Sequence, residues 1–452
     1  MPSKKSCYTD GISNFHDPHH HMRLSVLNKF LLILVVCVAS SVQNLQAQEP
    51  TPDELEQIKH DSINKRRLLD NIGNGYFPTK FLNLDLRYLI KFNQYEGFRT
   101  GLGGVTNDAF SERYRINSYV VYGFKDHRWK FRIGGGFRIA PKTSTWLHLS
   151  YTDDLIETGS STFLTDKRFF SFFEPRLINI DLFHKHITKA LNLEHSLHPK
   201  LLTETELSIS KIDPTYDYSF NINGQSFENF DVSLAKVAFQ WSPFDEFENE
   251  DGALNQTKNG YPKMTLQLTQ GFDGVLKGDF NFFKADFRTI HKLIFNKDVF
   301  TEATLTSGWA TGDTPLTHLY HAYPNNVNKP TILERFSVAG INSFETMYFN
   351  EFFSDRYATL QLKHYVKPFK ITEKYRPQLV LISRMAIGDM SNIERHQGIE
   401  FGTFDQGFSE AGIELNKLLF GFGLSFAYRY GAYHLPKLED NMALKFTFNI
   451  TL

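Results

Sequence analysis

The densest group of reactive side chains surrounds Ser354, in the heptapeptide EFFSDRY. A hydrolytic site needs a nucleophile, a base and an orienting group within hydrogen-bond reach of one another. Ser354 and His364 are ten residues apart in the sequence, which is roughly 33 Å along one extended strand, so they do not form such a pair. His148 lies near Asp153 and Asp154 in the sequence, but no nucleophile accompanies them. The spacing therefore predicts a protein that is not an enzyme, with a barrel-embedded hydrolase as an alternative.

Strand periodicity predicts a structural role for Asp355. Neighbouring side chains of a strand point to opposite faces, so Asp355 shares a face with polar residues, whereas Arg356 shares a face with leucines and extends toward water. A carboxylate shielded from water needs a partner, and Lys329 and Arg335 lie on the long preceding loop, 311–342. We expect this loop to fold inward, with Asp355 paired to Lys329 or Arg335.

Other residue patterns give weaker indications of a metal or phosphate site. His184 and His186 point to one strand face, but no third metal ligand is apparent. The acidic stretch 245–251 offers oxygen ligands of the kind that calcium takes, yet a solvated loop explains it more simply. The glycine-rich stretches 101–104 and 134–136 lie within predicted strands, not in the strand–turn–helix context of a phosphate loop. We predict no metal and no cofactor.

The composition points to strands that are apolar on one face only. The chain has 452 residues, including 43 Phe and 20 Tyr, yet its mean hydropathy is −0.34. A chain that is polar on average but rich in aromatics is typical of a membrane barrel with aromatic girdles. The formal net charge of −1 gives no support for nucleic-acid binding, which normally requires a basic excess.

The N-terminal region resembles an export signal. Arg23 and Lys29 precede the apolar run 30–39, and a polar stretch then ends at Ala47. This pattern predicts a secretory signal peptide cleaved after Ala47, with residues 1–21 as an upstream extension. Cleavage there removes both cysteines of the chain, so the mature protein needs no disulfide.

A short helix is expected at the start of the mature chain. The sequence Thr51-Pro52-Asp53-Glu54 supplies an N-cap, a proline at the first helical position and a capping-box glutamate. We therefore divide the chain into the extension and cleaved signal peptide (1–47), a periplasmic lead-in helix and linker (48–79), and an outer-membrane β-barrel (80–452). A plug inside the barrel lumen is the alternative role for this helix.

Beyond residue 80 the apolar residues recur with a period of two. In 81–93 the even positions are apolar and most odd positions are polar, over about eleven residues, which is the length of a tilted membrane strand. The stretches 129–139, 360–363, 420–430 and 444–452 repeat the pattern. We expect the terminal apolar face to form the assembly signal that barrel-assembly machinery binds; its residues are Phe446, Phe448, Ile450 and Leu452.

Long polar stretches alternate with tight turns between these strands. Eighteen segments resemble strands, and with both ends of the barrel in the periplasm this number would place the longest loop, 311–342, on the periplasmic side. Merging two segments before the loop, and absorbing residues 343–352 into it or into the next strand, gives sixteen strands and places the loop outside the cell, where long loops of such barrels usually lie. The sequence therefore predicts an all-β fold, a transmembrane antiparallel β-barrel of about sixteen strands, with a range of roughly 14 to 18.

Several stretches resemble an uncharacterised outer-membrane barrel family of Bacteroidota, catalogued as a domain of unknown function. The resemblance covers most of the mature chain and implies a barrel similar to the surface-antigen and assembly-factor barrels. Members often carry an N-terminal carboxypeptidase-regulatory-like domain, which this sequence lacks. The matching stretches are 93–104 (NQYEGFRTGLGG), 118–126 (SYVVYGFKD), 150–154 (SYTDD), 272–278 (FDGVLKG) and 352–365 (FFSDRYATLQLKHY).

Three function classes remain for a protein expected in the outer membrane of a Gram-negative bacterium. The first is a non-enzymatic barrel, either porin-like, for passage of small solutes, or active in outer-membrane or surface biogenesis. The second is a structural or surface-interaction barrel with a loop-filled lumen, and the third is the hydrolase. The expected partners are outer-membrane lipid and, during biogenesis, the barrel-assembly machinery.

Overall fold

The fold is all-β in the part of the chain that the computed structural model describes. That part is Ile72 and residues 75–140, 143–166, 175–250, 253–372, 375–419 and 421–448. The chain divides into two units, Met1–Lys65 and Arg66–Leu452, and every described residue belongs to the second. The predicted signal peptide and nearly all of the predicted lead-in helix fall outside the described residues. Among the described residues, no helix is long and apolar enough to span a membrane.

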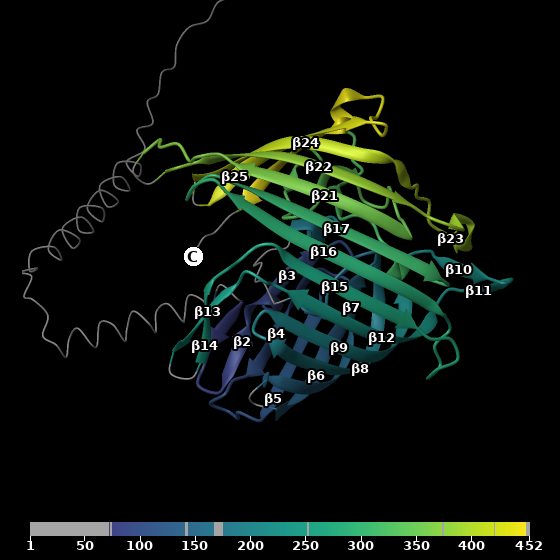
Figure 1. The fold of residues 1–452 in the computed structure, drawn as a ribbon. Helices are drawn as coiled ribbons and strands as arrows, with labels where there is room; N and C mark the ends of the chain where they lie inside the picture. Colours follow the sequence, from purple (N-terminus) through teal and green to yellow (C-terminus); the bar gives the residue numbers. More distant parts are fainter. Residues whose placement is uncertain are drawn as a thin grey trace, which may run out of the picture. The chain divides into compact units, whose positions relative to one another are not determined.

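Nineteen strands form one large sheet in which strands that follow one another along the chain pair antiparallel (Figure 1). Three smaller sheets, β10–β11–β23, β13–β14 and β18–β20, lie in the connections. The strands of the large sheet are β1 Tyr76–Pro78, β2 Leu82–Asp85, β3 Ile90–Asn93, β4 Gly97–Thr106, β5 Tyr114–Gly123, β6 Arg128–Ala140, β7 Thr145–Glu157, β8 Phe183–His198, β9 Leu201–Pro214, β12 Phe230–Trp241, β15 Lys263–Gly271, β16 Phe282–Ile294, β17 Phe300–Gly312, β19 Ser337–Val338, β21 Arg356–Tyr365, β22 Gln378–Asp389, β24 Phe404–Leu419, β25 Phe422–Gly431 and β26 Met442–Phe448. Those of the smaller sheets are β10 Ser219–Ile222, β11 Gln225–Phe227, β13 Glu246–Glu250, β14 Ala253–Lys258, β18 Pro324–Asn326, β20 Phe344–Tyr348 and β23 His396–Gln397.

The strand number agrees with the sequence prediction. β2 and β3 pair with opposite ends of β4, so they form one interrupted strand. Counting them as one, and setting aside the short β1 and β19, leaves sixteen strands in series. β1 lies at the end of the predicted linker and pairs with β2, so the sheet begins slightly before residue 80.

The first strand departs from the uninterrupted alternation predicted over 81–93. A 3-10 turn, η1 (Leu86–Tyr88), separates β2 from β3, and the Asp85 side chain caps it by accepting from the backbone N–H of Arg87. Tyr88 then stacks on Tyr119 of β5, with ring centroids 4.1 Å apart. Gly103 makes this possible, because a Cβ there would lie 2.4 Å from the Tyr88 ring. A local capping interaction and a missing side chain on the neighbouring strand therefore override the period-two pattern.

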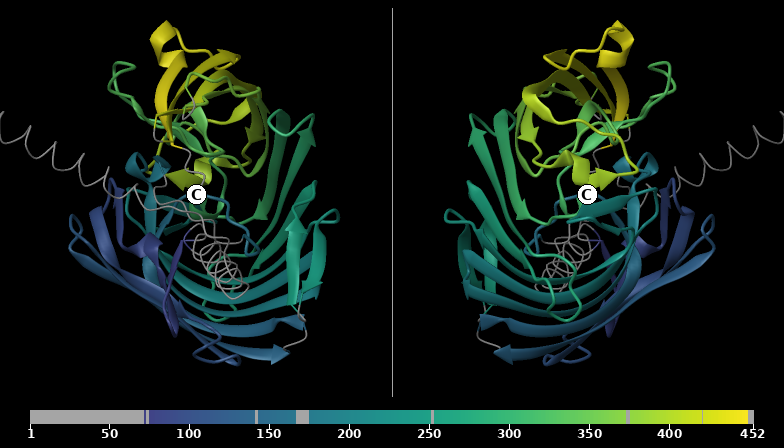
Figure 2. Two further views of the ribbon diagram at one scale, coloured as in Figure 1. Left: turned by 90° about the vertical axis from the view of Figure 1, so that its left-hand side faces the viewer. Right: turned by 90° about the vertical axis from the view of Figure 1, so that its right-hand side faces the viewer.

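The two faces of the sheet differ in chemistry, as the periodicity predicts. The sheet curves so that one face is concave and contacts the connecting loops (Figure 2). Along β6, Trp129 and Ile133 on the convex face are each 63% exposed, whereas Lys130 on the concave face is 3% exposed. Along β21, Leu360 and Leu362 are exposed and Gln361 and Lys363 are buried. Apolar side chains thus cover the outside and charged ones the inside.

The predicted closure of the barrel is not found in the described residues. The last strand, β26, pairs with β25 on one side and with the short β19, in parallel, on the other. The N–H of Ala339 also donates to the carbonyl of Phe446 at 2.7 Å. Exposed strand edges recruit further backbone partners, and here a connecting loop covers that edge in place of the first strand.

Two of the four predicted assembly-signal residues fall within β26. Phe446 lies on the convex face and is 42% exposed, as the alternation requires. Phe448 is the last residue of β26, and Ile450 and Leu452 lie outside the described residues. Recognition by assembly machinery stays a prediction.

A substitution at Leu149 tests whether the convex face contacts lipid. Leu149 lies in the middle of β7, is 63% exposed and pairs with Gly135 and Leu191. Leu149→Arg is expected to lower the free energy of unfolding in lipid vesicles by about 2–4 kcal/mol, because it places a charge in hydrocarbon. Urea titration in vesicles measures this, with Leu149→Phe as the apolar control. Equal stability of the arginine variant and the wild type would contradict a lipid-facing surface.

Candidate functional site

Two long connections fold back onto the concave face of the sheet. The first joins β7 to β8 and the second, 313–355, joins β17 to β21; Figure 2 shows both ends of the sheet with these loops inside its curve. We call the described parts of these connections, 158–166, 175–182 and 313–355, the loop plug. Most of its residues between 314 and 326 are buried, as are 343–347.

The two loops hold each other through buried polar contacts. His321 Nε2 lies 2.7 Å from Glu157 Oε1, and Arg176 pairs with the same carboxylate at 2.5 Å. The backbone N–H of Ser161 donates to the hydroxyl of Tyr323 at 3.0 Å. Burial lowers the pKa of His321 from its usual value, and the Glu157 carboxylate opposes that shift. The loops therefore dock as one body.

Glu410, on β24, anchors the second loop to the concave face. Its carboxylate accepts from the backbone N–H groups of Glu345 and Thr346 at 3.0 and 2.9 Å and from the Thr346 hydroxyl at 2.7 Å. Arg384, on β22, donates to the same carboxylate at 2.6 Å. Both side chains of this ion pair are at most 1% exposed. A buried pair of this kind is costly unless its remaining hydrogen-bonding groups are satisfied. For the Glu410 carboxylate the loop supplies two backbone N–H groups and one hydroxyl, whereas Nε and Nη2 of Arg384 are buried without a hydrogen-bond partner.

Glu345 forms a second buried cluster one step along the loop. It accepts from Asn325 and Ser343 at 2.8 Å each and from the N–H of Gly340 at 3.0 Å. Lys445 of β26 lies 3.7 Å away. Burial raises the pKa of Glu345, while Lys445 and Arg384 oppose the shift. Lys445 also donates to the Ser337 hydroxyl at 2.9 Å, so this cluster links the plug to the last strand.

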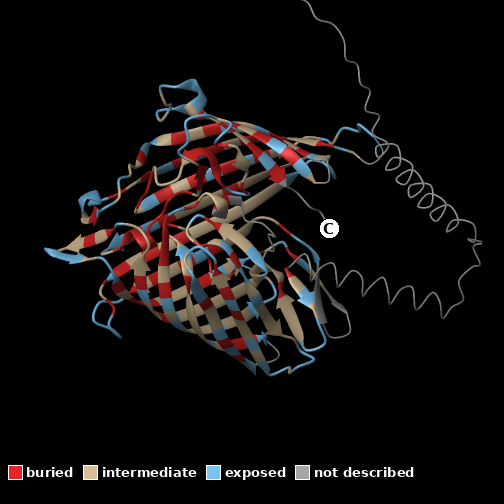
Figure 3. Cartoon of the chain, turned by 180° about the vertical axis from the view of Figure 1, so that it is seen from behind, coloured by how far each residue is buried: buried red, intermediate tan, exposed pale blue. Residues whose placement is uncertain are grey.

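Aromatic side chains fill the space around these polar anchors. Buried segments, red in Figure 3, alternate with less buried ones along the strands and also lie in the connections. The largest buried apolar side chains come from both the plug and the strands, and include Tyr320, Phe344, Phe353, Phe404 and Phe408. Such packing excludes water from this part of the lumen.

The structure does not bring Asp355 together with Lys329 or Arg335. The Asp355 carboxylate pairs with Arg356 at 3.1 Å and accepts from the N–H of Ser391 at 2.7 Å. Arg335 donates instead to Asp440 at 3.3 Å and to the carbonyl of Lys329 at 2.6 Å. Asp355 lies just before β21, where it faces the β22–β24 connection and not the loop. The carboxylates that hold the loop are those of Glu345 and Glu410.

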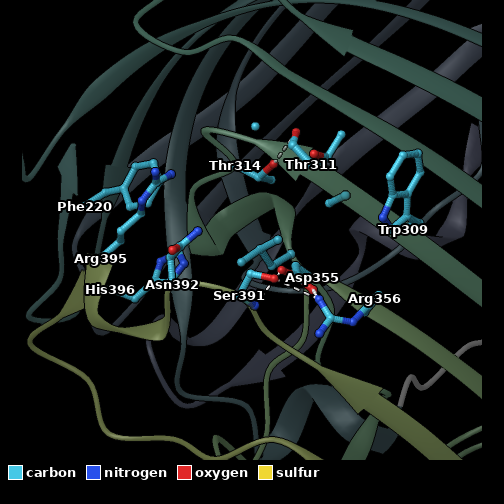
Figure 4. A pocket seen from close by; sticks show the side chains of 13 residues that line it. Phe220, Trp309, Thr311, Thr314, Asp355, Arg356, Ser391, Asn392, Arg395 and His396 are labelled. Carbon is cyan, nitrogen blue, oxygen red and sulfur yellow. Dashed lines mark hydrogen bonds and ion pairs between the residues drawn. The ribbon is translucent and has the colours of Figure 1, made fainter. Parts of the chain in front are cut away.

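Asp355 lines a small cavity of about 150 Å³ (Figure 4). Arg356, Ser391, Arg395 and His396 also line it. Arg356 pairs with Asp389, and Arg395 pairs with Asp313 at 2.9 Å. Ligand pockets are typically about 300–1,000 Å³, so this cavity is too small for most organic ligands, and its charges satisfy one another.

The residues weighed as catalytic or metal ligands are also placed apart. Ser354 is fully buried, and His364, at the far end of β21, shares a hydrogen bond of 2.9 Å with Thr301. His184 and His186 lie on the same face of β8, as their spacing predicts, but both are buried. Within the described ranges, no group of three or more His, Cys, Asp or Glu side chains is placed to hold a metal ion.

Sequence reasoning missed the anchoring residues. Arg384 is the single charge in the mostly apolar stretch from Leu379 to Ile387, and Glu410 occupies an inward position of β24. An isolated charge within an apolar strand needs a buried partner, and this is the signal that would have identified Arg384. The identity of its partner depends on strand pairing, which the sequence alone does not supply.

The family described as "Family of unknown function (DUF5686) C-terminal domain" matches residues 76–308. No curated protein matches the chain significantly. Among solved structures, it is similar to BamA from Haemophilus ducreyi lacking POTRA domains 1-3, with 9% identity and a TM-score of 0.48, over 81% of this chain and 69% of that one. It is also similar to CdiB from Acinetobacter baumannii, with 11% identity and a TM-score of 0.41, over 81% of this chain and 59% of that one. For CdiB from Escherichia coli the identity is 8% and the TM-score 0.43, over 82% of this chain and 62% of that one. The chain thus spans about three fifths of each CdiB chain.

Removing the Glu410 charge is expected to loosen the plug. Glu410→Gln leaves Arg384 buried without its carboxylate, and breaking one side of a buried ion pair costs about 3–5 kcal/mol. Chymotrypsin should then cut the folded protein near Phe344, which is fully buried in the wild type. Glu394→Gln, at an exposed position, is the matched control. Unchanged protease resistance of the Glu410 variant would contradict the anchoring role.

Lowering the pH is expected to reduce the stability of the folded protein through His396. Burial, with a smaller contribution from Arg395, lowers the pKa of His396 from 6.5 to about 4. As the pH falls, His396 therefore takes up a proton in the unfolded chain before it does so in the folded protein. Its contribution to the free energy of unfolding is fully present above pH 6.5 and is lost between pH 6.5 and 4, by on the order of 3 kcal/mol. His396→Phe should flatten the stability–pH profile in this window, whereas His434→Phe, at an exposed position, should not. Identical profiles for wild type and His396→Phe would refute the assignment.

Proposed function

We propose that this chain, which belongs to the DUF5686 family of unknown function, is a non-enzymatic β-barrel protein of the outer membrane whose lumen is closed by its own loops. Among the roles considered from the sequence, this arrangement favours outer-membrane or surface biogenesis, or a surface-interaction role, over free diffusion of small solutes. A porin-like open channel fits the buried loop plug poorly.

The observation that carries the membrane assignment is the opposite chemistry of the two sheet faces. In hydrocarbon every backbone polar group needs an internal partner, so a protein spans the membrane as helices or as a closed sheet of strands. Sixteen strands paired in series, with large apolar side chains exposed on the convex face, meet this requirement everywhere except at the two edges of the sheet. In a water-soluble protein the same surface would be an aggregation hazard.

The filled lumen is the observation that favours a closed resting state. The plug is held by a buried ion pair, by backbone hydrogen bonds to Glu410 and by the contact of His321 with Glu157. A conducting pore of constant width would require these contacts to break. Partners of such a barrel are lipid and, at Phe446 on the terminal strand, the machinery that inserts barrels.

A gated passage for small solutes is the second candidate. It is favoured by a polar cavity of about 810 Å³ on the concave side of β5 to β9. The described plug residues Leu164, Thr165 and Asp166 line this cavity. Displacement of the plug would connect the cavity to the opposite end of the sheet.

Conductance in planar bilayers separates a plugged barrel from an open pore. The wild-type protein is expected to be silent, and a variant in which a short Gly-Ser linker replaces residues 316–353 is expected to give discrete open steps. Steady open steps of the unmodified protein would contradict the proposal. Labelling by a serine-hydrolase probe that is lost in Ser354→Ala would contradict the absence of enzymatic activity.

A further inference from the structure

The cavity of about 810 Å³ lies on the concave side of β5, β6, β7, β8 and β9. Its rim includes the β4–β5, β8–β9 and β12–β15 connections, with Asp108, Lys200 and Asp245 among its residues. These three connections lie at the same end of the sheet. The plug segment 164–166 lines another side of the cavity and is fixed by Leu164, whose N–H donates to Gln267 at 2.9 Å.

A row of short side chains crosses the wall of the sheet at this cavity, and Asn117 of that row lines it. Asn117, Gly134, Ser150, Ala190 and Ser208 are consecutive cross-strand partners, so one row across five strands carries no long side chain. In the next row, a Cβ at Gly136 would lie 2.4 Å from the ring of His148. The glycine therefore allows His148 to lie flat along the wall.

Two arginines of the cavity differ from the other cations of the same wall. Arg99 pairs with Asp154 at 2.6 Å, and Lys130 with Glu96 at 2.6 Å. Within the described part of the chain, the guanidinium groups of Arg115 and Arg132 have no carboxylate within salt-bridge distance. The Nε of Arg132 is buried without a hydrogen-bond partner.

The ring of Trp146 supports one of these arginines. The guanidinium carbon of Arg115 lies 4.1 Å from the ring centroid, a cation–π contact that holds the side chain while leaving its N–H groups free for another acceptor. Trp146 itself is buried. The charge of Arg115 is therefore oriented but not neutralised.

Two of the acidic residues across the cavity have partners within the sheet. Glu206 pairs with Lys236 at 3.0 Å, and Glu204 accepts from Asn192 at 2.7 Å. The wall formed by β5 to β7 thus carries an excess of positive charge, and the wall formed by β8 and β9 carries carboxylates and an amide. A ligand that fits both walls has an oxyanion at one end and hydrogen-bond donors at the other.

We propose that this cavity is a binding site for a small solute that carries a phosphate or carboxylate group. Arg115 and Arg132 bind the oxyanion, because planar guanidinium groups match its geometry with paired hydrogen bonds. Asn117 lies between them in register and adds an amide donor, and Glu194 and Glu204 accept from hydroxyl or amino groups of the solute. The cavity volume is within the range of about 300–1,000 Å³ that is typical of ligand sites. This site goes beyond the proposed function, since a closed barrel without a ligand needs no unpaired arginines.

Trp146 provides a built-in reporter for the test. The chain has four tryptophans, and the other three, Trp129, Trp241 and Trp309, are 63%, 49% and 51% exposed. We would titrate the detergent-solubilised full protein with glycerol 3-phosphate and record tryptophan fluorescence. A saturable change is expected, and it should disappear in Trp146→Phe. A change that persists in Trp146→Phe, or that choline produces equally, would overturn the proposal.

Substitutions at the arginines decide whether they form the site. Arg132→Gln and Arg115→Gln should each weaken glycerol 3-phosphate binding by about tenfold or more, since each removes a charge-assisted hydrogen bond to the phosphate group. Arg395→Gln, outside this cavity and paired with Asp313, is the matched control and should bind normally. Heat-modifiable gel mobility of each variant checks that it has folded. Wild-type affinity in the folded double variant Arg115→Gln, Arg132→Gln would refute the site.

The same oxyanion chemistry occurs in a free solute and in a lipid headgroup. A parallel titration therefore uses vesicles containing phosphatidylglycerol in place of glycerol 3-phosphate. Arginine-dependent saturation by the free solute supports the proposal as stated. Saturation by the anionic vesicles alone overturns the assignment to a soluble ligand and assigns the headgroup instead.

Discussion

The structure depends on how it accommodates charged side chains on the concave face of a curved sheet. A charge removed from water is costly unless a partner and hydrogen bonds compensate for it. Arg384 and Glu410 are nearly fully buried, and the loop backbone at Glu345 and Thr346 donates two hydrogen bonds to the Glu410 carboxylate. The need to satisfy these charges fixes where the long loop lies, and the loop position in turn fills the lumen.

The remaining architecture follows from the same separation of polar and apolar groups. Because the convex face carries exposed aromatic and aliphatic side chains, many charged residues of the strands point inward, where the loops or neighbouring strands must pair them. One end of the concave side is packed with aromatic rings around Phe344 and Phe408. The other end keeps a polar cavity, in which two arginines have no carboxylate partner among the described residues.

Much of the fold could be predicted from the sequence, whereas the contacts of the plug could not. Alternation along 129–139 and 420–430 predicts which residues face outward, because strand geometry has a fixed period of two. The 3-10 turn after Asp85 escapes this rule, since it depends on a cap and on Gly103 of the neighbouring strand. The pairing of Asp355 with Arg335 was wrong because a loop of more than thirty residues has many conformations, and only the strand register decides which acids lie beneath it.

Hydrogen exchange of the folded protein in lipid nanodiscs tests the central claim most directly. If Glu410 holds the plug, the backbone amides of Glu345 and Thr346 should exchange as slowly as those of β24, although they lie in a connection between strands. Exchange of these two amides at the rate of an unstructured peptide, while β24 remains protected, would contradict the account.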